Sequence, residues 1–179
     1  MAETTPRDEL RLALDVPRWA WRCYRRHLPL IAGLSLVPSV QRLLTVRWGE
    51  HLPHALALGS EIVVTGTRLV LLLLLWRLAM AGRRPTWANA TEFWRAHWPS
   101  QLIQAGLLSL AFLTFDVVAE RLVGALLPEP ARPTYLAVLL FVKNPTVIAF
   151  TFVWWIGILR QVLTREEPAT AAPRSAPRS

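Results

Sequence analysis

Cysteine and lysine are nearly absent from this chain of 179 residues, in which each occurs once, as Cys23 and Lys143. A single cysteine excludes an intrachain disulfide and any metal site made of several cysteines. The chain also contains no glycine-rich phosphate loop, no G-x-S-x-G elbow and no H-E-x-x-H motif. The sequence therefore predicts neither an enzyme nor a bound cofactor or metal.

Acidic residues are scarce as well, 12 against 20 basic residues, which gives a formal net charge of +8. In a soluble protein such an excess indicates nucleic-acid binding. Here the arginines lie at the ends of apolar stretches, and hydrophobic residues make up 53% of the chain, more than the roughly 45–50% of soluble proteins. We therefore assign the charge to membrane association and expect no nucleic-acid partner.

The clearest membrane span is Glu61–Met80, which is about as long as a bilayer is thick at the helical rise of about 1.5 Å per residue. Arg68 lies inside it. An arginine at mid-bilayer costs roughly 3 kcal/mol on the insertion scale, and each leucine or valine returns roughly 0.3–0.6 kcal/mol. The leucine-rich run after Arg68 offsets this cost, so the segment is expected to span despite the charge.

Three further apolar stretches complete an all-α membrane protein of four spans, with a transmembrane domain over 28–163. These stretches are Leu28–Val46, Gln101–Ala119 and residues 135–162. The last is interrupted near Pro145. Either one long helix is kinked there, or a short segment precedes a span that Asn144 caps. Length favours the second arrangement, since Pro145–Val162 alone suffices for a short span.

Two amphipathic stretches, residues 16–27 and 86–98, are predicted to lie as short helices in the membrane interface. The first has Asp15 as a possible N-cap and Pro17 in its first turn. Its arginines share one face, which suits anionic lipid head groups, although a basic extension of the first span is an equal alternative. Tryptophans are expected to anchor the chain at head-group depth. These residues are Trp19, Trp21, Trp48, Trp87, Trp94 and Trp98.

The arginine distribution predicts the orientation. The N-terminal arm 1–27, the segment 77–98 and the tail from Arg160 hold most of the basic residues, whereas 42–54 and 120–143 hold few. By the positive-inside rule, both termini face the cytoplasm of a cell membrane. The arm lacks the apolar core of a cleavable signal peptide, and the tail over 164–179 is low in complexity and expected to be disordered.

A short motif, R-x-H-x-P, occurs at Arg25–Pro29 and again at Arg95–Pro99, at the entrances to the first and third spans. This indicates either a duplication into two parallel units or a chance match. A second histidine group, Glu50, His51 and His54, has no complete metal-binding spacing because Pro53 interrupts it. We expect a solvated loop over 47–59.

Ionisable residues inside spans mark functional sites by default. Glu61, Arg68, Asp116 and Lys143 are all expected in the outer half of the bilayer, and the sequence favours an Arg68–Asp116 pair with Glu61 or Lys143 beside it. The pair either fixes helix register or lines a polar cavity that binds the head group of a lipid or other amphiphile. In a third alternative each charge extends to the interface unpaired.

These features favour a non-enzymatic accessory or scaffold subunit of a membrane complex, which needs only spans, packing faces and basic interfacial helices. The alternative is a small transporter or amphiphile-binding protein that acts as a dimer, because four spans enclose little volume. Expected partners are anionic lipid head groups at the cytoplasmic face, together with a protein partner or a second copy of the chain.

Overall fold

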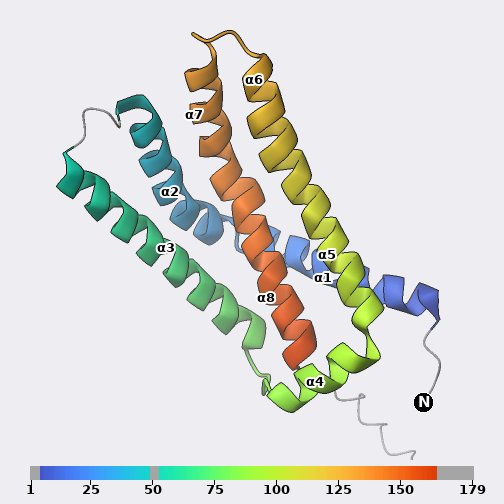
Figure 1. Cartoon of the computed structure of the whole chain (residues 1–179). Helices are drawn as coiled ribbons and strands as arrows, with labels where there is room; N and C mark the ends of the chain where they lie inside the picture. Colours follow the sequence, from blue (N-terminus) through green and yellow to red (C-terminus); the bar gives the residue numbers. More distant parts are fainter. Residues whose placement is uncertain (1–4, 49–52, 165–179) are drawn as a thin grey trace, which may run out of the picture.

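The computed structural model describes residues 5–48 and 53–164, and all secondary structure in these ranges is helical. Four helical runs are long and apolar enough to cross a membrane: Leu28–Thr45, His54–Met80, Trp98–Leu126 and Arg132–Leu163. Figure 1 shows these runs going alternately up and down, with the third and fourth forming a long hairpin. The predicted all-helical chain with four candidate spans is therefore confirmed.

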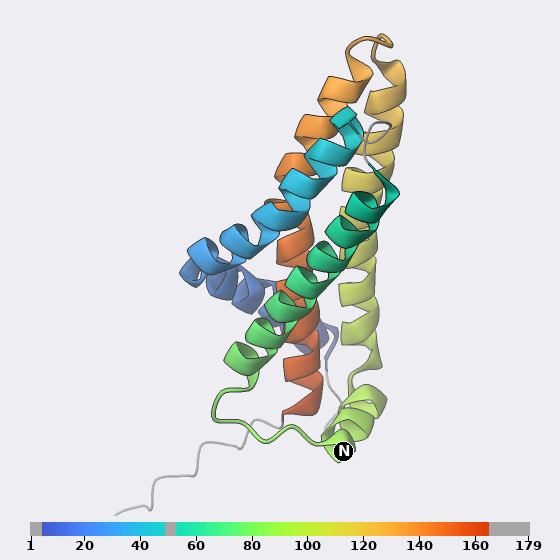
Figure 2. The same cartoon turned by 90° about the vertical axis from the view of Figure 1, so that its left-hand side faces the viewer.

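The first two candidate spans are α2 (Leu28–Trp48) and α3 (His54–Met80), which lie in front of the hairpin in Figure 2. The prediction that α3 begins at Glu61 is wrong. The helix starts directly after Pro53, which occupies the N-cap position, so residues 54–59 of the expected loop are helical. Glu61 consequently lies about two turns inside α3 rather than at its end.

The third run consists of α5 (Trp98–Phe112), the π-helical segment η2 (Leu113–Val123) and the short α6 (Gly124–Leu126). It continues past the predicted end at Ala119, so Glu120 belongs to the helix. Arg132 closes the turn that follows, because its Nε donates to the Gly124 carbonyl at 2.9 Å. This bond satisfies a carbonyl that the helix end leaves without a partner.

The fourth run is one continuous helix made of α7 (Arg132–Lys143), the π-helical η3 (Asn144–Ile148) and α8 (Ala149–Leu163). Asn144 is helical rather than a cap, so the favoured arrangement of two separate segments is wrong. Proline lacks an N–H and leaves earlier carbonyls without their bond. Here Ser39 Oγ donates to the Phe141 carbonyl at 2.9 Å, and Asn144 Nδ2 donates to the Leu140 carbonyl at 3.1 Å. The Ser39 hydroxyl thus replaces the bond that Pro145 cannot donate to the Phe141 carbonyl, and the Asn144 side chain adds a second donor to the Leu140 carbonyl, which also accepts from the Asn144 backbone N–H.

An amphipathic helix, α1 (Pro6–Arg26), crosses the hairpin obliquely behind α8 and α5 (Figure 1). It begins well before the predicted Val16. The reason is a capping box, in which the side chains of Thr5 and Asp8 each hydrogen-bond the backbone N–H of the other residue. Pro6 occupies the first helical position. Pro17 accordingly lies inside the helix. Ala13, Val16, Ala20 and Tyr24 are buried, and the last three belong to the same core as residues of α3 and α8.

The second predicted amphipathic helix is present as α4 (Trp87–Ala96), which closes one end of the bundle (Figure 1). The Thr86 backbone N–H and Asn89 Nδ2 both donate to the Leu163 carbonyl, at 3.1 and 3.3 Å. These bonds join α4 to the end of α8. Whether α1 and α4 lie in a membrane interface stays a prediction.

Both R-x-H-x-P motifs form the same corner between two helices. His27 has φ −112° and ψ 22°, His97 has φ −128° and ψ 31°, and each N–H bonds the carbonyl four residues earlier. Each histidine therefore ends one helix, and the next helix starts at once with proline in its first turn. The corners match, but α1 packs on α8 and α5 whereas α4 packs mainly on the end of α8, so the duplication stays a prediction.

Candidate functional site

The four predicted intramembrane residues, Glu61, Arg68, Asp116 and Lys143, all line one cavity of about 340 Å³ between α2, α3, η2 and the α7–η3 junction. Two further ionisable residues line it, Arg42 from α2 and Glu120 from η2. Sequence reasoning missed Glu120 because the third span was ended one residue too early. The spacing of four between Asp116 and Glu120, which puts both on one helical face, was the available signal.

Lys143 is the buried centre of this cavity wall, with a side chain only 5% exposed. Its Nζ lies 2.5 Å from Asp116 Oδ1 and 3.0 Å from Glu120 Oε2, and both carboxylates are about one-third exposed. The expected Arg68–Asp116 pair is therefore wrong. Asp116 and Lys143 lie at nearly equal distances along the chain from Glu129 in the turn, so an antiparallel hairpin brings them to the same height.

Arg68 faces the cavity from the middle of α3 and is exposed. Neither Arg68 nor Arg42 forms an ion pair with any residue in the described ranges. Guanidinium groups donate in a planar fork that matches phosphate and carboxylate. The cavity therefore presents two guanidinium groups that form no ion pair within the described part of the chain.

Glu61 has a fixed position in this cavity. Its Oε1 accepts a hydrogen bond from Gln41 Nε2 at 2.9 Å, and the same nitrogen lies 3.3 Å from Ser60 Oγ. These bonds tie α2 to α3. The second carboxylate oxygen of Glu61, Oε2, has no hydrogen-bond partner among the described residues, so it can accept a hydrogen bond from a ligand.

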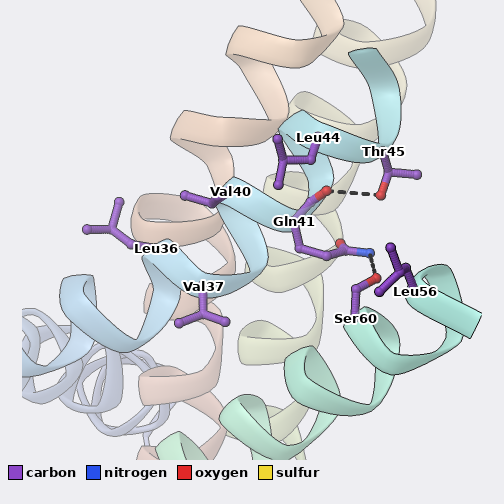
Figure 3. Close-up of a pocket in the computed structure, with 8 residues that line it drawn as sticks. All are labelled: Leu36, Val37, Val40, Gln41, Leu44, Thr45, Leu56 and Ser60. Carbon is purple, nitrogen blue, oxygen red and sulfur yellow. Dashed lines mark hydrogen bonds between the residues drawn. The ribbon is translucent and has the colours of Figure 1, made fainter. Parts of the chain in front are cut away.

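An apolar groove of about 630 Å³ adjoins the cavity where α2 passes the start of α3 (Figure 3). Val37, Val40 and Leu44 line one side, and Leu56 lines the other. Figure 3 shows Gln41 extending from α2 toward Ser60 at this groove, and Gln41 also lines the charged cavity. The groove depends on how two helices cross, which residue periodicity does not reveal.

A second polar network joins α1 to the opposite end of the bundle. Glu9 is 5% exposed and pairs with His97, because its Oε1 lies 2.8 Å from His97 Nδ1. Beside it, Gln104 Nε2 donates to Gln161 Oε1 at 3.0 Å, and Gln161 Nε2 donates to the Leu12 carbonyl at 2.9 Å. Sequence reasoning missed this network because the predicted helix began only at residue 16, after Glu9 and Leu12. The buried polar groups instead fix where α1 packs.

Replacing His97 with alanine is expected to destabilise the protein by roughly 1.5 kcal/mol, since a buried acceptor left without its donor costs roughly 1–3 kcal/mol. Glu9 would lose its only described side-chain partner. Thermal unfolding in detergent measures the effect. The matched control is His27→Ala at the equivalent corner, because His27 makes only backbone hydrogen bonds within the described ranges. Equal effects at both histidines would contradict a specific role for the Glu9 pair.

The predicted tryptophan anchors have different surroundings. Trp87, Trp94, Trp98 and Trp21 are exposed, at 80%, 58%, 56% and 53%. Trp19 instead packs on α8, where the Arg160 guanidinium carbon lies 5.0 Å from its ring centre. The side chain of Trp48 lies outside what the structure describes. The α4 end of the bundle thus presents three exposed indoles, and Trp19 belongs to the helix packing.

No cluster of three or more metal-ligating side chains occurs within residues 5–48 and 53–164, and Glu50 and His51 of the histidine group fall outside these ranges. Burial raises the pKa of the Cys23 thiol, although Arg160 and Arg26 act in the opposite direction. A thiol with a raised pKa stays protonated at neutral pH and is a poor nucleophile. The charged cavity and its groove are therefore the candidate site.

Comparison with protein-family models, curated proteins and solved structures finds no match to this chain.

Proposed function

We propose that this chain is a non-enzymatic, multi-pass protein of the cell membrane that binds the head group of a membrane amphiphile in the charged cavity. The observation that carries the proposal is Arg68. It lies in the middle of a candidate span, lines the cavity and has no ion-pair partner within the described residues. Snorkelling to an interface is the competing explanation for such a side chain.

Energetics favours a bound anion over an empty site. An arginine at mid-span costs roughly 3 kcal/mol on insertion, and no carboxylate in the described ranges forms an ion pair with Arg68. A phosphate or carboxylate at the guanidinium forms charge-assisted hydrogen bonds, which are about twice as strong as neutral ones. The opposite wall of the cavity holds Asp116 and Glu120, which lie in the π-helical η2, and Lys143, which directly precedes the π-helical η3. π-helical segments are frequent at functional sites.

Arg68→Gln is expected to lower the amount of lipid that remains bound after purification by about tenfold or more, because charged hydrogen bonds contribute about 1.5–3 kcal/mol. Native mass spectrometry of the detergent-purified protein measures retained lipid per chain. Arg77→Gln is the matched control, since Arg77 is exposed on the same helix and does not line the cavity. Equal retention in both variants would reject the proposed site.

A second candidate function is that of an accessory or scaffold subunit. The observation in its favour is the exposed face of Trp87, Trp94 and Trp98 at the α4 end, because tryptophans are enriched both in protein interfaces and at membrane surfaces. Crosslinking in native membranes separates the cases. A discrete larger complex supports an accessory subunit with a protein partner, and self-dimers alone support an amphiphile-binding or transport role.

The proposed orientation places both termini in the cytoplasm, where the basic residues of α1 and α4 meet anionic head groups. Reporter fusions at Pro85 and Thr170 should therefore score as cytoplasmic, and fusions at Gly49 and Glu129 as external. The charged cavity then belongs to the outer half of the bilayer. A cytoplasmic score at Gly49 or Glu129 would overturn the four-span topology.

A further inference from the structure

The ionisable residues that line the charged cavity balance one another. Three are basic and three acidic, and Lys143 is shared between Asp116 and Glu120. That group retains one surplus negative charge, and Glu61 adds a second. Arg42 and Arg68 contribute two positive charges without ion-pair partners among the described residues. A ligand that complements both kinds of charge must itself carry a cation and an anion.

The apolar groove lies next to this cavity, and Gln41 lines both. Apart from Gln41, Thr45 and Ser60, every residue that lines the groove is apolar (Figure 3). Val40 and Leu44 are 45% and 43% exposed, so the described chain leaves much of this surface uncovered. A charged cavity beside an apolar groove matches a molecule with a charged head and a hydrocarbon chain.

We propose that the ligand is a zwitterionic phospholipid with a primary ammonium group. Its phosphate binds Arg68 and Arg42, its ammonium binds Glu61, and one acyl chain lies in the groove between α2 and α3. This inference rests on the proposed function and adds the head-group class and the position of the chain. Glu61 is suited to the ammonium because Gln41 holds Oε1 and leaves Oε2 open.

An anionic phospholipid fits this cavity less well. Its phosphate satisfies the two guanidinium groups, but no cation then faces Glu61 or the surplus charge beside Lys143. An uncompensated charge in a low-dielectric site is unfavourable. The ammonium of the zwitterion supplies a cation for Glu61, so the expected preference depends on the head group and not on the amount of apolar surface.

The test is competitive binding in nanodiscs that contain equal amounts of phosphatidylethanolamine and phosphatidylglycerol, with retained lipid counted by native mass spectrometry. We expect the wild-type chain to retain about tenfold or more phosphatidylethanolamine than phosphatidylglycerol, since one charged hydrogen bond changes a binding constant by about that factor. Glu61→Gln should abolish or reverse this preference, and Arg68→Gln should lower the retention of both lipids. Equal wild-type retention of the two lipids, with the Arg68 effect intact, would overturn the zwitterion while preserving the proposed function.

The chain position is tested by Val40→Trp, which should fill the groove and lower retention of phosphatidylethanolamine about tenfold or more, as expected when an acyl chain loses its site. Val70→Trp is the matched control, because Val70 has nearly the same exposure, 47%, and does not line the groove. Leu44→Trp is a second variant should Val40→Trp fail to fold. Unchanged retention in a folded groove variant would overturn the chain position. Absence of any Arg68-dependent lipid would reject the proposed function and this inference together.

Discussion

Replacing Lys143 with methionine is expected to destabilise the protein by about 3 kcal/mol, the lower end of the range for breaking a buried ion pair. Lys143 is 5% exposed and holds both Asp116 and Glu120, so its loss leaves two carboxylates facing each other without a cation. The lower end applies because each carboxylate is about one-third exposed and can recruit water. The free energy of unfolding in mixed detergent micelles measures the effect.

Two further variants separate the ion-pair explanation from a general loss of packing. The triple variant Lys143→Met, Asp116→Asn, Glu120→Gln should recover most of the lost stability, because the removed cation no longer leaves charges unpaired. Arg68→Met should leave stability unchanged or raise it, since Arg68 has no described carboxylate partner. A large loss in Arg68→Met together with a silent Lys143→Met would instead support the pairing first predicted from sequence.

The existence and number of the spans could be predicted from the sequence because span length and hydropathy are properties of single segments. Their ends could not, because short capping signals decide them. Thr5 and Asp8 start α1 by bonding each other, and Pro53 starts α3, although both lie in stretches whose polarity suggests loops. Local hydrogen bonds outweigh average composition at these ends.

The helix continues through Pro145, where the sequence predicted a break, and the reason for this error is different. Proline removes a hydrogen bond within its own helix, and the sequence of that helix shows only the loss. The replacement comes from Ser39 on α2, more than one hundred residues away along the chain. Such a partner is visible only once α2 and α7 are known to be neighbours.

The candidate site was predictable in its members but not in its pairing. Charges inside apolar stretches are costly, which singles out Glu61, Arg68, Asp116 and Lys143 from sequence alone. Which acid meets which base depends on register between helices. The continuous third helix turns Asp116 and Glu120 toward Lys143, while Arg68 is left facing the cavity. The apolar groove is formed where α2 and α3 cross, so no single segment of the sequence predicts it.

Replacing Gly157 with alanine is expected to destabilise the packing of α1 on α8 by about 2 kcal/mol, within the usual cost of overpacking. A Cβ at Gly157 would lie 2.8 Å from Trp19 Cε3 and 3.0 Å from Val16 Cγ1. The Trp19 ring cannot easily move, because it packs on the core and its face lies against Arg160. Thermal unfolding in detergent and protease sensitivity of α1 measure the loss.

Gly106→Ala is the matched control, because Gly106 also lies inside a helix and a Cβ there meets nothing within 4 Å. Alanine is the better helix former by about 1 kcal/mol, so this variant should be neutral or slightly stabilising. Combining Gly157→Ala with Trp19→Leu should restore part of the stability by making room for the methyl group. The opposite signs expected at the two helical glycines follow from the position of one indole ring, which packs α1 directly against α8 at Gly157. Destabilisation of equal size at both glycines would show that helix propensity or lipid contact, and not the close approach of Trp19, determines the result.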